Sequence, residues 1–144
     1  MGGEHMIVFR WDEHLQTDHQ RIDHENRNII ERAQALSDSI IYGEDKEKIL
    51  EDVFLLKKAV LTHFEQEEMM QQYSNFSAYY DHKSSHEKFM KQLNKLLHKI
   101  VNEPNVENHA DELSTLISKN YFNHIQTYDQ DAAKYIMRRD YYHN

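Results

Sequence analysis

The chain has 144 residues, and its 17 Lys plus Arg against 25 Asp plus Glu give a formal net charge of −8. One domain of this length can fold alone, and three Gly and one Pro are too few for an all-β or α/β architecture. The absence of cysteine excludes disulfides and thiolate chemistry, and the acidic balance argues against nucleic acid as a partner. Eleven histidines point instead to a metal, because imidazole is the commonest side-chain ligand for transition metals.

The sequence contains a short tag-like segment at its start and no targeting or membrane-spanning segment. Residues 1–6 contain two of the glycines and look like an expression-tag remnant, so we predict one domain over residues 7–144. No stretch approaches the roughly 20 consecutive apolar residues of a membrane span, and no segment resembles a signal peptide. We therefore expect a cytoplasmic protein without a membrane partner.

The first two helices are predicted from punctuation and periodicity. Thr17 and Gln20 form a capping box at the start of the first, Gly43 ends it, and a polar break at Ser74 to Ser77 ends the second. Core-type residues recur in steps of three and four, which keeps them on one helical face. They are Ile22, Asn26, Ile29, Ala33, Leu36 and Ile40, then Ile49, Val53, Leu56, Val60, His63, Glu67 and Met70.

Two further helices follow, separated by a break at Glu103-Pro104-Asn105. Their core-facing residues are Tyr79, His82, His86, Phe89, Leu93, Leu96 and Ile100, then Leu113, Ile117 and His124. Short connections favour antiparallel neighbours. The sequence therefore predicts an all-α, up-down-up-down four-helix bundle with left-handed packing.

Six polar residues interrupt these apolar faces, and they should meet inside the bundle: Asn26, His63, Glu67, His82, His86 and His124. Burying imidazoles and carboxylates without partners costs several kcal/mol, and a metal supplies a common partner. A single buried histidine is more often an ordinary hydrogen-bonded core residue. Two helical pairs at i, i+4 together with His124 favour the metal interpretation.

The motifs themselves resemble a known family. His63 and Glu67 form HxxxE, His82 and His86 form HxxxH, and His124 with Asp129 forms HxxxxD. This combination resembles the bacterial hemerythrins, as do the opening Trp11-Asp12-Glu13 and the dipeptide Ile22-Asp23. The resemblance implies a hemerythrin-like four-helix bundle with a non-haem di-iron centre.

The resemblance also implies a role for each residue. His82, His86 and His124 would bind one iron and His63 the other, while Glu67 and Asp129 would bridge the two together with an oxo or hydroxo group. The five-residue step from His124 to Asp129 places Asp129 about 140° away on an ideal helix. We therefore expect a local π-helical widening if Asp129 is to reach the same centre.

Asn26 departs from the family pattern, which has a further histidine ligand in the first helix. His24 lies about 200° around the helix, and His19 lies about 10 Å along the axis, so neither is a ready substitute. Two interpretations stay open: a tolerated loss in which water fills the vacancy, or a coordination position opened for an exogenous ligand. Both predict a centre that oxidises readily in air.

The function implied is binding of O2 or NO at a di-iron site that serves as an oxygen or redox sensor. The domain would be no enzyme itself but the input module of a signalling protein such as a diguanylate cyclase. A stand-alone oxygen carrier is the alternative. A ferritin-like oxidase or peroxidase is disfavoured because no histidine has Glu three residues before it, and a zinc-containing or metal-free bundle is a further class.

The remaining residues receive simpler interpretations. We expect surface positions for His5, His14, His98, His109 and His143. Four residues beside the motifs are expected to pack around the centre and keep it dry, namely Phe64, Met69, Met70 and Phe89.

Overall fold

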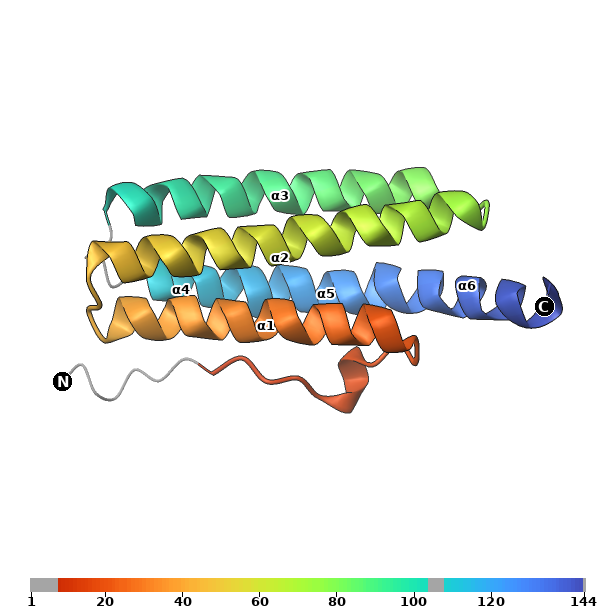
Figure 1. The fold of residues 1–144 in the computed structure, drawn as a ribbon, viewed down its shortest axis with the longest axis horizontal. Helices are drawn as coiled ribbons and strands as arrows, with labels where there is room; N and C mark the ends of the chain where they lie inside the picture. The colour runs from red at the N-terminus through yellow and green to blue at the C-terminus, as the bar shows by residue number, and fades with distance from the viewer. Residues whose placement is uncertain (1–7, 104–107, 144) are drawn as a thin grey trace.

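A computed structural model describes residues 8–103 and 108–143, which contain four helical segments and no β-strand. The first three segments are α1 (Gln20–Ile41), α2 (Lys46–Tyr73) and α3 (Tyr79–Asn102). The fourth runs without a break through α4 (Asn108–Thr115), η3 (Leu116–Tyr121), α5 (Phe122–His124), η4 (Ile125–Asp129) and α6 (Gln130–His143). Successive segments run antiparallel (Figure 1), which confirms the predicted four-helix bundle. The predicted tag remnant lies outside the described residues.

The start of α1 differs from its predicted capping box. Asp18 has a positive φ of 67°, so the chain turns sharply and leaves Thr17 outside the helix. His19 is the N-cap residue instead, and its Nδ1 accepts a hydrogen bond from the Ile22 backbone N–H at 3.3 Å. Thr17 donates from both its N–H and its hydroxyl to Asp23 Oδ1, at 2.9 and 2.7 Å. The capping box with Gln20 is therefore wrong.

The two described connections are tight turns at the predicted breaks. Gly43, with φ 68°, reverses the chain after α1, and its N–H donates to the carbonyl of Ile40. Asp45 then caps α2 by accepting from the Lys48 N–H at 2.9 Å. Asn75, with φ 56°, makes the corresponding turn between α2 and α3. These short turns force neighbouring helices to pack side by side.

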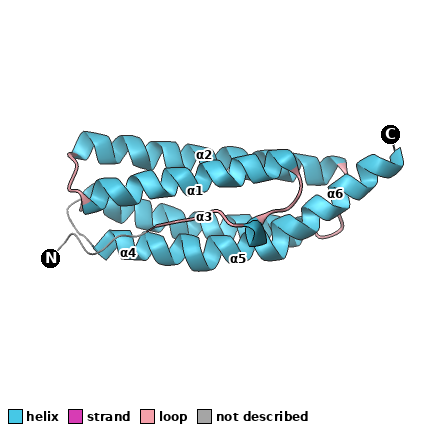
Figure 2. Cartoon of the chain, turned by 90° about the horizontal axis from the view of Figure 1, so that it is seen from below, coloured by secondary structure: helices cyan, strands magenta, loops and turns pink. Residues whose placement is uncertain are grey.

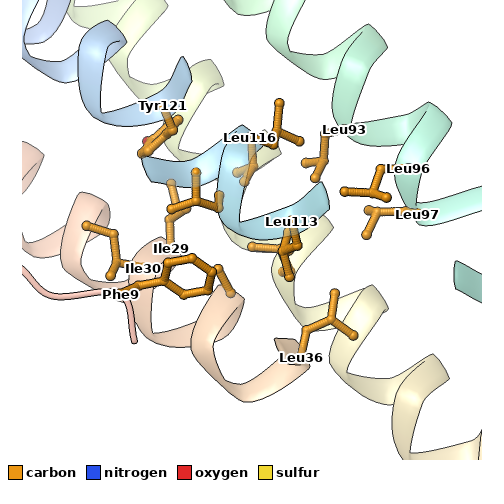
Figure 3. Packing of buried hydrophobic residues seen from close by; sticks show 14 of the residues in the cluster. Phe9, Ile29, Ile30, Leu36, Leu93, Leu96, Leu97, Leu113, Leu116 and Tyr121 are labelled. Carbon is orange, nitrogen blue, oxygen red and sulfur yellow. The ribbon is translucent and has the colours of Figure 1, made fainter. Parts of the chain in front are cut away.

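The apolar core fills the half of the bundle that contains the α1–α2 turn and the start of α4. Leu36, Leu93 and Leu113 come from three different segments and are completely buried, as Figure 3 shows among their neighbours. Tyr121 marks the border of this cluster. Beyond it, toward the α2–α3 turn, the buried faces carry the polar residues, so the bundle has one apolar half and one polar half.

An N-terminal arm, which includes the short turn η2 (Glu13–Leu15), lies along α1 and the fourth segment (Figure 2). The Phe9 N–H donates to the Gln34 side chain at 2.7 Å, and the Arg27 guanidinium lies 5.0 Å from the Trp11 ring. At its other end the Gln130 amide donates to the His14 carbonyl. The arm therefore covers the side of the bundle on which α1 meets the π-helical turn η4.

One residue predicted at the surface is buried, and one predicted in the core is exposed. His109 is buried, with only 3% exposure, because it lies one helical turn before Leu113 on the same inward face. Met69 is 55% exposed because it follows buried Glu67 by two residues and so points about 200° away. His14 and His98 are exposed as predicted, whereas the side chains of His5 and His143 lie outside the described part. Among the described helices, none has the length and hydropathy to cross a bilayer.

Candidate metal centre

Five buried side chains converge in the polar half of the bundle, and one possible ligand atom from each lies within 4.8 Å of all the others. They are Glu67 from α2, His82 and His86 from α3, His124 from α5, and Asp129 from η4. None is more than 4% exposed. The structure therefore brings these five predicted residues together at one point.

The carboxylates of Glu67 and Asp129 share His82 between them. Glu67 Oε1 lies 3.0 Å from His82 Nε2 and 2.9 Å from His86 Nε2. Asp129 Oδ1 lies 3.0 Å from His82 Nε2 and 3.1 Å from His124 Nε2. The inner nitrogens of the three imidazoles thus face two carboxylate oxygens, a donor set suited to a borderline transition metal.

His63 faces the same carboxylates from α2 and is fully buried. Its Nε2 is 3.9 Å from Glu67 Oε1 and 3.7 Å from Asp129 Oδ2, which is too far for a hydrogen bond. Among the described residues neither His63 Nε2 nor Glu67 Oε2 has a hydrogen-bond partner. Two unpaired, completely buried polar atoms that face one cluster are costly unless cations satisfy them. The side chains therefore fit a metal centre.

A π-helical turn brings Asp129 to the centre. Residues Ile125–Asp129 form the π-helix η4, whose wider turn offsets the five-residue step from His124. The widening that the sequence predicts is therefore present. A second π-helix, Leu116–Tyr121, precedes it and ends on a tyrosine that the sequence analysis did not single out.

Each of the four imidazoles has an outer partner at Nδ1, and sequence reasoning missed all of these partners. Such contacts fix the orientation of the ring and direct Nε2 toward the centre of the cluster, where a metal would bind. The outer atoms and their distances from Nδ1 are Glu25 Oε1 at 2.8 Å for His63, Gln71 Nε2 at 2.6 Å for His82, Glu68 Oε2 at 2.8 Å for His86, and Ser85 Oγ at 2.8 Å for His124. Glu25, Glu68 and Ser85 each directly precede or follow a residue of the predicted set, the one signal that could have found them.

The Gln71 amide meets His82 through its nitrogen, while its buried Oε1 has no partner among the described residues. Turning the amide by 180° places Oε1 against Nδ1 and lets it accept the Nδ1–H bond. That arrangement pairs Oε1 with the Nδ1–H, and the amide NH2 takes the position that Oε1 held. It also leaves His82 Nε2 unprotonated and free to bind a metal.

Asn26 reaches the cluster but already has partners. It is completely buried, its Nδ2 donates to Asp129 Oδ2 at 3.0 Å, and its Oδ1 accepts from the Tyr121 hydroxyl at 2.5 Å. His24 is exposed and His19 caps α1, so neither offers an imidazole to the cluster. The first-helix position is thus occupied by an amide that contacts the cluster through its nitrogen.

The electrostatics of the cluster follow from its burial. Burial alone would lower the pKa of His63, but the carboxylates of Glu67 and Asp129 raise it to about 10. Burial and the Asp129 charge raise the pKa of Glu67 well above its usual range. Burial would also raise the pKa of Asp129, yet the surrounding imidazoles, His124 foremost, hold it well below its usual range. Without metal cations, the raised pKa values of His63 and Glu67 therefore favour the protonated forms of both side chains.

Two surface pockets reach the outer edges of the centre. One of about 570 Å³ is lined by Ser85, His124 and Tyr128 at the junction of α3 with the fourth segment. The other, of about 580 Å³ between α2 and α3, is lined by Phe64, Glu68 and His86. Because the His86 ring stacks on Phe64 at 3.8 Å, the second approach is shielded by an aromatic side chain. The two pockets therefore meet the outer edges of His124 and His86, while the centre itself stays buried.

The sequence of this chain is similar to those of several bacterial proteins. A bacteriohemerythrin of Pseudomonas paraeruginosa is 30% identical over 130 residues, which cover 88% of this chain and 82% of the relative. Bacteriohemerythrins from two strains of Pseudomonas aeruginosa match with the same identity and coverage. The chain belongs to the bacteriohemerythrin family. No family profile matches it, and no solved structure gives a significant match.

Membership of the bacteriohemerythrin family confirms the resemblance predicted from the three motifs. The family and the buried cluster of histidine, glutamate and aspartate fit a di-iron, oxygen-binding domain. The bundle holds these side chains on rigid helices, and loops contribute none of the five converging residues. Such a scaffold favours a preorganised centre.

Replacing Glu25 with glutamine should weaken metal binding at His63. The change removes the negative charge at 2.8 Å from Nδ1, so the imidazole becomes a poorer donor and its orientation is held less firmly. We expect a loss of about tenfold or more in metal affinity, measured by competition with a chelator. Glu31→Gln, an exposed position on the same helix, is the matched control. Equal metal affinities of the two variants would show that Glu25 does not support a metal ligand at His63.

Proposed function

We propose that the cluster holds two iron ions and that the domain binds O2 or NO as an oxygen or redox sensor. His82, His86 and His124 would hold one ion and His63 the other, with Glu67 and Asp129 between them. The observation that carries the proposal is the pair of unpaired buried atoms, His63 Nε2 and Glu67 Oε2, which face three further imidazoles and a second carboxylate. Four imidazoles and two carboxylates exceed what one tetrahedral zinc would need.

When bound, the iron pair would supply reversible oxidation and an open position for a diatomic ligand. The protein's own residues supply orientation and exclusion of water. The outer carboxylates of Glu25 and Glu68 make the two imidazoles that they contact, His63 and His86, stronger metal ligands. Phe64, Phe89 and Tyr121 form the aromatic layer between the cluster and the apolar core, which keeps that side of the centre dry.

Two features favour a sensor over a carrier. Asn26 stands where the resemblance implies a histidine, so the site would have one strong nitrogen donor fewer and should oxidise more readily. Asp129 also directly precedes α6, which extends beyond the other helices (Figure 1). A displacement of Asp129 on oxidation would therefore pass along α6, whose Tyr135 hydroxyl donates to the Ser74 carbonyl at 2.9 Å. We propose that α6 leads to a signalling output domain, for example a diguanylate cyclase, and that the four-helix domain itself is no enzyme.

The proposal is tested by iron content and optical spectrum. Protein loaded anaerobically with ferrous ion should retain two irons per chain, and air should produce a visible absorption that azide alters. The same preparation loaded with zinc supplies the control. Protein that retains no iron after desalting, or an oxidised spectrum that azide leaves unchanged, would overturn the di-iron assignment.

Loading the protein with ferrous ion is expected to release protons at neutral pH. In the absence of a cation His63 has a pKa of about 10 and is therefore protonated, whereas only a neutral imidazole binds metal. Proton and metal compete for Nε2, so iron affinity should fall as the pH falls, by about tenfold per pH unit for each proton displaced. An indicator dye in weakly buffered solution measures the release.

The control for this measurement is His98→Gln, which removes an exposed histidine remote from the cluster. It should release as many protons as the wild type. Proton release that is absent, or iron affinity that stays constant between about pH 6 and 8, would show that metal does not displace a proton from His63.

A further inference from the structure

Asn26 and Tyr121 form a buried hydrogen-bond chain that ends on the cluster. Both side chains are completely inaccessible, and they come from α1 and η3, which are far apart in the sequence. The tyrosine hydroxyl donates to Asn26 Oδ1 at 2.5 Å, and Asn26 Nδ2 donates to Asp129 Oδ2 at 3.0 Å. The same Asp129 oxygen is 3.7 Å from His63 Nε2. The amide therefore lies on the side of Asp129 that faces His63.

The direction of the Asn26 amide is set from both ends. A carboxylate oxygen only accepts hydrogen bonds, so Asp129 favours the amide nitrogen. If the amide turned by 180°, its oxygen would oppose Asp129 Oδ2, and the Tyr121 O–H would have no acceptor at that position. An unpaired buried donor is costly. A cation at the centre would attract the amide oxygen, and the hydroxyl is the group that opposes this turn.

Packing keeps the Tyr121 hydroxyl in place. Its ring lies 5.0 Å from Phe89 and 5.9 Å from His124, with the second pair nearly parallel. Phe64 packs at 6.4 Å on the same ring. Because the ring is enclosed in this layer and belongs to the π-helix η3, the hydroxyl cannot follow the amide if it turns. Tyr121 can therefore act as a fixed anchor.

We propose that Tyr121 is a positioning residue that fixes Asn26 as a hydrogen-bond donor toward Asp129 and withholds the amide oxygen from a metal bound by His63. The inference rests on the proposed di-iron function and deepens it. The position beside His63 is then left for an external ligand that can accept a hydrogen bond from the amide. Such ligands are small anions, or diatomic molecules that gain negative charge on binding.

The first test uses metal-free protein and observes the Asn26 side-chain NH2 by ¹⁵N NMR, assigned by its disappearance in Asn26→Asp. In the wild type these hydrogens should exchange with solvent much more slowly than those of an exposed asparagine such as Asn94. Tyr121→Phe should accelerate the exchange by about tenfold, because the amide loses one of its two anchors. Tyr135→Phe removes a hydrogen-bonded hydroxyl outside the cluster and should change nothing. Fast exchange in the wild type, or no acceleration in Tyr121→Phe, would overturn the proposal.

The second test measures azide affinity of the iron-loaded protein by optical titration, at matched iron content. Tyr121→Phe should bind azide about tenfold more weakly, because the freed amide oxygen competes for the position beside His63. In an Asn26→Ala background the same change should have no effect. Equal affinities in the first comparison, or weakening that persists without the amide, would overturn the proposal. A wild type that takes up no iron would overturn the proposed function, whereas the exchange measurement judges the hydrogen bond by itself.

Discussion

Asp129→Asn is expected to lose most of its bound iron. Asp129 contacts His82 and His124 through one oxygen, while its other oxygen accepts from Asn26 and faces His63. Asparagine has a single acceptor oxygen and no charge, so it cannot serve both sides of the centre or offset the charge of two cations. We expect iron affinity to fall by more than about a hundredfold, beyond the effect of changing an outer partner.

Asp131→Asn is the matched control, because it makes the same change two residues later at an exposed position of α6. This variant should keep the wild-type iron content. Circular dichroism of both metal-free variants should stay helical, because the apolar half of the bundle is untouched. Asp129→Asn that retains two irons per chain would contradict a bridging role for this carboxylate.

The period of the apolar residues was enough to predict the bundle and most of the inward-facing set. Residues such as Leu36 and Leu93 recur on one face in each helix, and all helices must bury that face. The five-residue step to Asp129 conflicted with an ideal helix, and that conflict itself indicated the π-turn. His109 is four residues before Leu113 on the same inward face, so the period of the fourth segment extends one turn further toward its start than predicted.

What periodicity could not predict are contacts that depend on the neighbouring helix. Glu25 meets His63 across α1 and α2, and Tyr121 meets Asn26 across η3 and α1. A period fixes the face on which a residue lies but not its partner on another element. The predicted N-cap of α1 was wrong for a related reason. A capping-box pattern does not reveal the positive φ of Asp18, which turns the chain before the helix begins.

Asn26→His is expected to slow the oxidation of the reduced protein in air by about tenfold or more. A tenfold slowing corresponds to about 1.4 kcal/mol added to the activation barrier. An imidazole at this position adds a strong nitrogen donor on the side of His63 and fills the place open to an exogenous ligand. The surroundings suit the change. Tyr121 can accept a hydrogen bond from the outer ring nitrogen, just as the other four imidazoles have an outer partner at Nδ1.

The rate is followed by the growth of visible absorption after anaerobically reduced protein is mixed with air-saturated buffer. Asn94→His, an exposed position on α3, controls for the addition of a histidine. The same variants distinguish the two interpretations of Asn26. If the position is open to ligands, Asn26→His should also weaken azide binding; if water merely fills a vacancy that ligands do not use, azide affinity should stay unchanged while oxidation slows. An oxidation rate equal to that of the wild type would show that Asn26 does not control the reactivity of the centre.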